Sequence, residues 1–344
     1  MAYTGINKSS AYFNTKLYTG NGGTNAITGV GFQPDWTWIK SRNASNNHRN
    51  YDAVRGATKI IYQNLTNAEA TQSNGLTAFG SDGFTLGDDG NSNSNNATYA
   101  SWNWKAGTGQ GSSNTDGSIN TTYTSVNTTA GFSISQYTGT GSLATVGHGL
   151  GAVPSMIITK VLTTTHNWGV YHQELGNTSA VYLDLPNDKS DSSAWWNNTS
   201  PTSSVFTINT RNEVNQGSQN YISYCFAEKT GYSKFGSYVG NGNANGTYVY
   251  TGFKPAWVMI KRTNSADAWY MFDNKRQGYN PSNELLRANS SSAESTPDRI
   301  DLLSNGFKLT DTDGSVNGSG GNYIFMAFAE APLVGTNNVP CTAR

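Results

Sequence analysis

The sequence predicts an all-β protein made of tandem antiparallel β-sandwich modules of jelly-roll or concanavalin-like type, in three sequence-related units. The first observation is one residue pattern that occurs three times at nearly constant spacing. The second is composition, because charged residues make up only 13% of the 344 residues while aromatics reach 12% and glycines number 38. Low charge with many aromatics favours short strands joined by tight polar turns.

The repeated pattern has three parts. Each copy begins with a tyrosine-glycine turn, continues with a proline-led apolar strand that ends in lysine, and closes with an aromatic strand. The turns start at Tyr18, Tyr137 and Tyr238, the middle strands cover 34–40, 154–160 and 255–261, and the closing strands cover 99–106, 221–229 and 323–331. From tyrosine to proline the spacing is 16, 17 and 17 residues, and from proline to the closing tyrosine it is 65, 67 and 68. Such regular spacing indicates one fold unit present three times.

The boundaries follow from the pattern and from composition. Residues 107–130 are rich in Gly, Ser and Thr with little apolar content, which predicts a linker, whereas the short connection around residue 232 predicts a stiffer junction. At 52–62 and 281–286 we expect one helical turn at most. The predicted order is an N-terminal lead-in 1–15, unit one 16–106, the linker 107–130, unit two 131–232, unit three 233–332 and a C-terminal tail 333–344.

Charge and cysteine content exclude several classes of protein. Lys plus Arg and Asp plus Glu both number 22, so no global field attracts nucleic acid or an anionic membrane. The two cysteines, Cys225 and Cys341, are too few for a disulfide scaffold. The N-terminus lacks the apolar stretch of a signal peptide, so we expect assembly in the cytoplasm where the chain is made.

Acidic residues occur in two equivalent loops, as Asp88 and Asp89 in unit one and Asp311 and Asp313 in unit three. Closely spaced carboxylate and amide oxygens are weak candidates for a calcium site, although the EF-hand spacing is missing. The alternative, which the sequence favours, is a solvated loop in which Asp, Asn and Gly supply turn geometry. We therefore expect no metal and no other cofactor.

No pattern of catalytic residues stands out. The chain has no G-x-S-x-G elbow and no phosphate-binding glycine loop. Glu228 and Glu330 occupy equivalent strand ends in Phe-Ala-Glu, and each is a single acid there. A glycosidase needs two carboxylates that flank the scissile bond. We expect a protein that is not an enzyme.

The tryptophans divide into two groups. Trp36 with Trp38 and Trp102 with Trp104 alternate along strands, which predicts core positions. Four others do not fit that alternation and are candidate contacts for a receptor or partner: Trp168, Trp195, Trp196 and Trp269. For Trp195 and Trp196, which lie in a polar loop, the sequence favours the alternative of a loop plug tucked into the fold. The lysines that end the middle strands, Lys40, Lys160 and Lys261, are expected at solvated strand ends.

Several stretches resemble a repeated module of structural proteins from marine tailed bacteriophages, of the cyanophage- and pelagiphage-like virion type. The resemblance covers nearly the whole chain and is carried by residues 31–42, 51–59, 81–84, 102–107, 221–246 and 328–332. It implies a virion structural protein, most readily a tail fibre or tail-associated adhesin that contributes to host surface attachment. Implied partners are other virion proteins and a host surface glycan or protein, in a homo-oligomer of trimeric type. It transfers no catalytic or binding residue.

Two other functions remain open from the sequence. A capsid decoration or head-fibre protein would use the same module in many copies on the head. A carbohydrate-active enzyme on a concanavalin-like fold belongs to another class, and it would release reducing ends from a surface polysaccharide.

Overall fold

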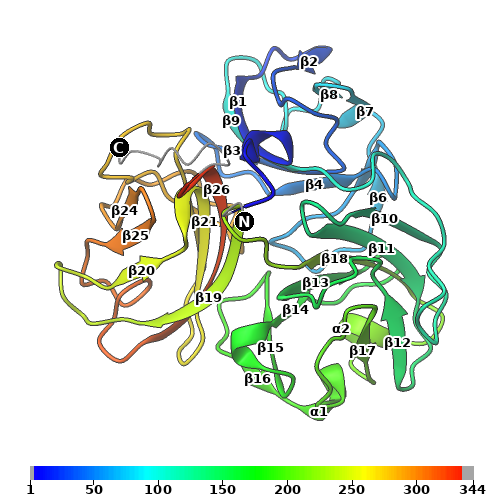
Figure 1. Ribbon diagram of the computed structural model, residues 1–344. Coiled ribbons are helices and arrows are strands. Elements are labelled where there is room, and N and C mark those ends of the chain that lie inside the picture. The colour runs from blue at the N-terminus through cyan, green and yellow to red at the C-terminus, as the bar shows by residue number, and fades with distance from the viewer. Residues whose placement is uncertain (1–3, 335–344) are drawn as a thin grey trace.

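Each of the three sequence-related units folds into a larger and a smaller antiparallel sheet in a computed structural model that describes residues 4–334 (Figure 1). The all-β antiparallel prediction is confirmed. Helices are confined to single turns: η1 (Ser9–Ala11), η2 (Gln173–Leu175), α1 (Ser193–Trp196) and α2 (Asn212–Asn215).

Unit one contains three sheets. The large sheet has the order β1 (Phe13–Thr19), β9 (Thr98–Trp104), β3 (Trp36–Ser41) and β4 (Arg49–Asp52). The smaller sheet has the order β2 (Asn25–Ile27), β8 (Gly83–Leu86) and β7 (Leu76–Gly80). A two-stranded pair is formed by β5 (Lys59–Ile60) and β6 (Ala70–Thr71).

Unit two has the longest sheet. Its order is β10 (Tyr123–Asn127), β11 (Phe132–Thr138), β18 (Asn220–Phe226), β13 (Met156–Val161), β14 (Gly169–His172), β15 (Ser179–Tyr182) and β16 (Ser190–Asp191). The smaller sheet pairs β12 (Ala144–Gly147) with β17 (Val205–Ile208).

Unit three repeats this plan. The large sheet has the order β19 (Ser233–Val239), β26 (Asn322–Pro332), β21 (Phe253–Arg262), β22 (Trp269–Asp273) and β23 (Leu286–Arg287). The smaller sheet has the order β20 (Tyr248–Tyr250), β25 (Gly306–Leu309) and β24 (Ile300–Leu303).

The three large sheets share one strand order: the tyrosine strand, the closing strand, the proline-led strand and the strand after it. In each unit the turn tyrosine pairs with the closing tyrosine, and the two rings stack with centroids 5.0, 5.2 and 4.9 Å apart. The pairs are Tyr18 with Tyr99, Tyr137 with Tyr221, and Tyr238 with Tyr323. The constant spacing in the sequence therefore corresponds to one set of ring contacts, formed once in each unit.

The glycine of the tyrosine-glycine turn is needed for close packing. A Cβ on Gly20 would lie 2.1 Å from the carbonyl oxygen of Ser94, and one on Gly139 would lie 2.4 Å from that of Gln216. A side chain at either position would therefore force the backbone apart.

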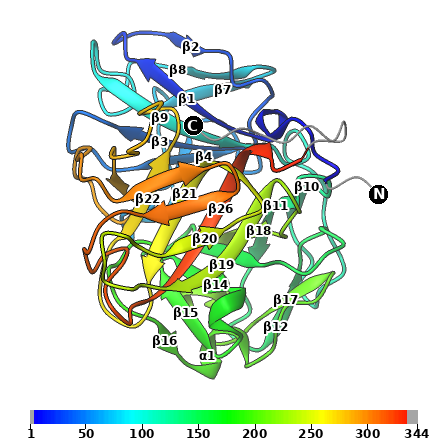
Figure 2. The same cartoon turned by 60° about the vertical axis from the view of Figure 1, so that its left-hand side comes forward.

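One apolar core joins the units. Each large sheet packs one face against its own smaller sheet, and the opposite faces meet in a shared cluster that includes Trp36 and Trp104 of unit one, Phe226 of unit two and Trp257 of unit three. Figures 1 and 2 show the three units arranged around this centre. The units are not separate modules in a row, because burial of both faces of each large sheet depends on the other units.

The segment predicted as a linker is a packed part of unit two. Strand β10 lies within 107–130 and pairs with β11. The start of the segment is held by Asp35, whose carboxylate accepts the backbone N–H groups of Ala106, Thr108 and Gly109 at 2.7, 3.0 and 2.7 Å. Its polar side chains form hydrogen bonds within the fold, so low apolar content did not mean a free chain here.

The predicted ends of the chain also differ from the structure. Residues 1–15 contain η1 and the first residues of β1, and the Phe13 ring stacks on Phe328 with centroids 4.8 Å apart. The lead-in therefore contributes to the shared core. Most of the predicted tail, including Cys341, lies outside the described residues, whereas Cys225 is buried in β18.

Candidate functional site

Backbone hydrogen bonds link the units in a closed ring. The donor lies just before β6 in unit one, just before β16 in unit two and before β24 in unit three, and the acceptor is the residue eight positions after the repeat proline of the next unit. The bonds run from Glu69 to Leu162 at 2.8 Å, from Lys189 to Thr263 at 3.1 Å and from Glu294 to Arg42 at 2.8 Å. We name the junctions one–two, two–three and three–one after the units that they join.

A ring nitrogen crosses each junction at the position fourteen residues after the proline. Trp168 donates its indole N–H to the Tyr62 carbonyl at 2.9 Å, and Trp269 donates to the Tyr182 carbonyl at 2.7 Å. His48 Nε2 lies 2.9 Å from the Arg287 carbonyl. The predicted exposed contact role of Trp168 and Trp269 is wrong, because both rings are buried and hold the junctions together.

The other two candidate tryptophans are buried as well. Trp195 and Trp196 form α1, and Trp196 donates its indole N–H to the Ser179 carbonyl at 3.0 Å. The guanidinium of Arg211 lies 4.5 Å from the centroid of the Trp195 ring. The prediction of exposed stacking surfaces is therefore wrong, and the alternative of buried loop plugs describes them.

The strand-end lysines are buried rather than solvated, which corrects the sequence prediction. Lys160 Nζ donates to the carbonyls of Thr66 and His166 at 2.9 and 2.6 Å, and Lys261 Nζ donates to those of Pro186 and Arg262 at 3.1 and 2.6 Å. Burial lowers the pKa of both ammonium groups to about 8. Lys40 in unit one is also buried, and burial lowers its pKa to about 8, but its Nζ donates to the carbonyls of Ser41 and Ala44 within unit one at 2.8 and 3.2 Å.

Two junctions contain a buried ion pair. At junction three–one, Arg276 contacts Asp273 at 2.7 Å, and Trp102 of unit one donates its indole N–H to Asp273 at 3.0 Å. Burial acts to raise the pKa of Asp273, but Arg276 holds it below its ordinary value. At junction one–two, Arg55 contacts Asp52 at 2.6 Å and Tyr224 donates its hydroxyl to Asp52 at 2.7 Å.

Junction two–three has neutral residues at the equivalent places. His172 stands where the other units have aspartate, Leu175 where they have arginine, and Met326 where they have Trp102 and Tyr224. His172 Nε2 lies 3.1 Å from the Phe325 carbonyl, while Nδ1 accepts the Glu174 N–H at 3.2 Å. These partners assign the proton to Nε2, and burial lowers the pKa of His172 to about 4.

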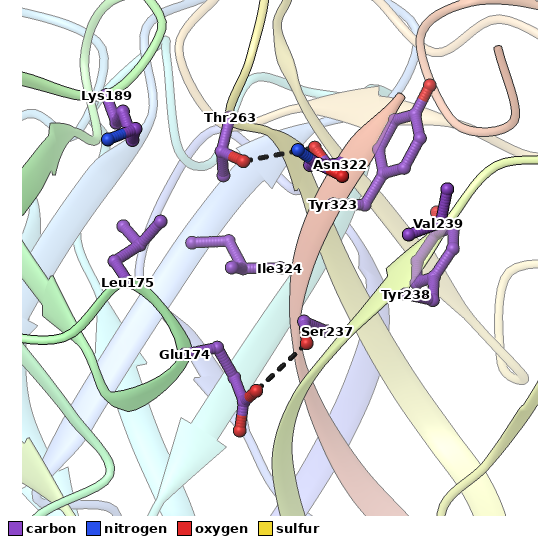
Figure 3. A pocket seen from close by; sticks show the side chains of 10 residues that line it. All are labelled: Glu174, Leu175, Lys189, Ser237, Tyr238, Val239, Thr263, Asn322, Tyr323 and Ile324. Atoms are coloured by element: carbon purple, nitrogen blue, oxygen red, sulfur yellow. Dashed lines mark hydrogen bonds between the residues drawn. The ribbon is translucent and has the colours of Figure 1, made fainter. Parts of the chain in front are cut away.

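A groove of about 510 Å³ opens at this neutral junction (Figure 3). Leu175 and Glu174 of unit two lie on one side, and Ser237 and Ile324 of unit three lie on the other. Ser237 donates its hydroxyl to the Glu174 carboxylate at 2.9 Å across the groove. Leu175 stands here in place of Arg276 of unit three, and Ser237 in place of Leu17 of unit one, so both lining positions carry smaller side chains than their equivalents. The remaining lining residues are Lys189, Tyr238, Val239, Thr263, Asn322 and Tyr323.

A second hollow of about 310 Å³ shares Glu174, Ser237 and Tyr238 with the groove. It lies between the edge strands β19 and β20. Tyr248 and Tyr250 of β20 line it and are 45% and 53% exposed, whereas Val249 between them is buried. Sequence reasoning missed these tyrosines, although their alternation in Tyr248-Val249-Tyr250 was a signal of two rings on one strand face.

The acidic loops have protein partners. Asp89 accepts the backbone N–H of Ser92 at 3.0 Å and lies 3.3 Å from Arg49, while Asp313 lies 2.7 Å and Asp311 3.3 Å from Arg299. Asp88 is exposed and accepts the Asn74 side-chain amide at 2.9 Å. Among residues 4–334 no group of three His, Cys, Asp or Glu is placed to hold a metal ion.

An asparagine in each acidic loop bonds that loop to the neighbouring tyrosine-glycine turn. Asn93 donates its side-chain amide to the carbonyls of Gly23 and Gly87 at 2.6 and 2.7 Å, and Asn317 makes the same kind of contacts with Asn243 and Asp311 at 2.8 Å each. These loops therefore fasten the tyrosine-glycine turns.

Comparison with known proteins places the chain in a family. No match was found among curated proteins or solved structures. No helix within residues 4–334 is long and apolar enough to cross a membrane. One family model matches residues 8–332 without interruption, across all three units. The chain therefore belongs to the family described as Domain of unknown function (DUF7483).

Proposed function

We propose that the protein is a bacteriophage virion structural protein, a tail fibre or tail-associated adhesin that contributes to host attachment. The observation that carries the proposal is the use of buried polar groups at the junctions. His48 and Lys160 each bond to a carbonyl of a neighbouring unit, and Asp273 of a buried ion pair accepts the indole N–H of Trp102 from unit one. Buried polar groups whose hydrogen bonds are satisfied make a structure rigid, and a structural protein of a virion needs such rigidity. The resemblance to phage virion modules points to the same role.

The groove at junction two–three supports the attachment part of the proposal. It is an open concave surface on a rigid frame, and its volume lies within the range of small-ligand sites. Sites on sheets and short turns hold their shape better than sites on long loops.

The test is to find the protein on the particle. Antibodies raised against the purified chain and coupled to gold are applied to phage particles purified from the lysate that contains the chain. The expected result is label at the tail, with a few copies per particle by quantitative mass spectrometry. Label over the head in many copies replaces the proposal with capsid decoration.

A chain absent from purified particles overturns the virion proposal. The enzymatic alternative is tested separately, by incubating the purified chain with host surface polysaccharide and measuring reducing ends. Release of reducing ends overturns the non-enzymatic assignment.

A further inference from the structure

We propose that the groove at junction two–three, together with the adjoining hollow, binds an uncharged oligosaccharide. The inference rests on the proposed attachment role and names the ligand class of its site. Tyr248 and Tyr250 supply the stacking surface, and the Glu174–Ser237 pair supplies the polar contacts to sugar hydroxyls.

The two tyrosines form a platform of the kind that sugar rings contact. They are separated by one residue on β20, so both rings project from the same face at a spacing of about 7 Å. Both rings are about half exposed in a molecule whose other β-strand aromatics are largely buried. The apolar C–H face of a pyranose packs on an aromatic face. The Tyr248 hydroxyl donates to the Asn305 carbonyl at 3.5 Å, so its oxygen can still accept a hydrogen bond from a sugar hydroxyl.

The polar groups beside the platform match hydroxyl groups. A carboxylate accepts hydrogen bonds from adjacent hydroxyls, and an amide both donates and accepts, so Glu174 and Asn322 can each bind a sugar diol. Leu175 and Ile324 supply an apolar floor between these groups. This mixture of an apolar floor with a few polar groups is typical of small-ligand sites.

The charges of the groove favour a neutral ligand. Lys189 lies 2.7 Å from Asp191, and Lys234 lies 2.8 Å from Glu228, so both ammonium groups already have a carboxylate partner. Glu174 adds a negative charge. A phosphate, a sulfate or a nucleic acid would meet no unpaired cation at this site.

The edge of β19 argues against an added peptide strand. In unit two, β10 lies along β11 and forms such a strand. In unit three, side chains occupy part of the equivalent edge: Phe235 donates its N–H to Glu228 at 3.3 Å, and its carbonyl accepts from the Gln173 amide at 2.6 Å. An incoming strand would have to displace both side chains.

The experiment measures glycan binding to the full chain. Neutral and acidic oligosaccharides are screened on an array, and binding of the best neutral glycan is then measured by titration calorimetry. Tyr248→Ala and Tyr250→Ala are each expected to weaken binding about tenfold or more, because each removes one stacking ring. Ser237→Leu introduces the side chain that unit one has at the equivalent position, Leu17. The larger side chain narrows the groove, so binding is expected to weaken by a similar factor.

The matched control is Tyr279→Ala. Tyr279 is also in unit three and is 80% exposed, but it lines neither hollow. This variant should bind like the unchanged chain, and the thermal midpoints of all four variants are compared so that misfolded chains are recognised. Equal losses in Tyr279→Ala and Tyr248→Ala would overturn the placement of the site.

Other outcomes also contradict the inference. Binding of acidic glycans alone overturns the proposal that the ligand is uncharged. Binding of an extended peptide that competes with the glycan at Tyr248 would show that the site takes an added peptide strand instead. No binding to any array member at high micromolar concentration sinks the inference. Gold label at the tail would still support the proposed function in that case, whereas glycan binding by a chain absent from particles would refute the virion role alone.

Discussion

Junction three–one and junction two–three use the same backbone geometry but different chemistry. The first encloses Asp273 and Arg276 under Trp102, and the second places His172 and Leu175 at the same positions. A large groove opens at the second. The difference teaches that the shared core and the backbone bonds keep the same arrangement of units at each junction, while the side chains at three equivalent positions change from an ion pair under an aromatic ring to neutral residues beside a groove.

The largest expected effect is acid destabilisation of both kinds of junction. Burial lowers the pKa of His48 to about 3 and that of His172 to about 4, below the ordinary value of 6.5. Between those values the unfolded chain binds more protons than the folded chain, so stability is present at neutral pH and falls as pH decreases from about 6.5 toward 4. Each histidine is expected to contribute on the order of 1 kcal/mol per pH unit in that window.

Urea unfolding at pH 7, 5.5 and 4.5 measures this slope. His48→Gln and His172→Gln should each reduce it. Asp184, whose pKa is raised by burial to about 6, acts in the opposite direction, because its folded form gains a proton first as pH falls. A stability that is flat from pH 7 to 4.5 would contradict the buried neutral histidines.

The next largest effect is expected at the charged junction. Arg276→Leu copies the residue of unit two but leaves Asp273 buried without its cation, and it should cost about 3–5 kcal/mol. The matched control is Lys189→Met, which breaks an exposed pair and should cost about 1 kcal/mol or less. Urea midpoints compare the two variants, and similar costs would mean that the buried pair stabilises the fold no more than the exposed pair does.

A smaller effect tests the indole hydrogen bonds at two junctions. Trp168→Phe and Trp269→Phe each remove one N–H donor and leave a carbonyl of the neighbouring unit without it, at a cost of about 2 kcal/mol. Thermal midpoints of the pair are compared directly. A much smaller cost for Trp269→Phe would show that junction two–three is looser throughout, beyond its groove.

The smallest effect concerns transfer of the charged arrangement to the open junction. Leu175→Arg alone places a cation beside His172, and His172→Asp alone buries an acid without a partner, so both should destabilise. The double variant should recover about 1 kcal/mol or more relative to the sum of the single changes, since the new residues can pair. A double-mutant cycle in urea measures this coupling, and additive effects would count against the equivalence of the junctions.

The fold class was predictable from the sequence because each strand and turn is encoded by a short local pattern, such as the tyrosine-glycine turns and the alternating Trp36 and Trp38. The repeat spacing then indicated which strands are equivalent in the three units. The contacts between units are not local. Lys160 is a charged residue one position before the end of β13, which suggests exposure to solvent, yet its ammonium group donates to the Thr66 carbonyl of unit one.

The prediction of exposed tryptophans was wrong for the same reason, because their contacts are with residues far away in the sequence. Trp168 has a polar neighbour on one side, and its partner carbonyl lies 106 positions earlier in the chain. Trp195 and Trp196 stand among serines and asparagines, so their neighbours in sequence hid their burial. One signal was present: Asp52 with Arg55 and Asp273 with Arg276 repeat the same spacing, and unit two lacks it.

The closed ring of contacts between units determines how stable the chain is after one unit has been removed. Removing one unit deletes two interfaces, not one, so a two-unit fragment would leave apolar faces of both remaining sheets in water. Because every unit both donates and accepts the same backbone bond, a single unit is by geometry self-complementary in a head-to-tail sense. Three separate copies of one unit could therefore close the same circle, which makes this chain a natural template for designing a symmetric trimer from a third of its length.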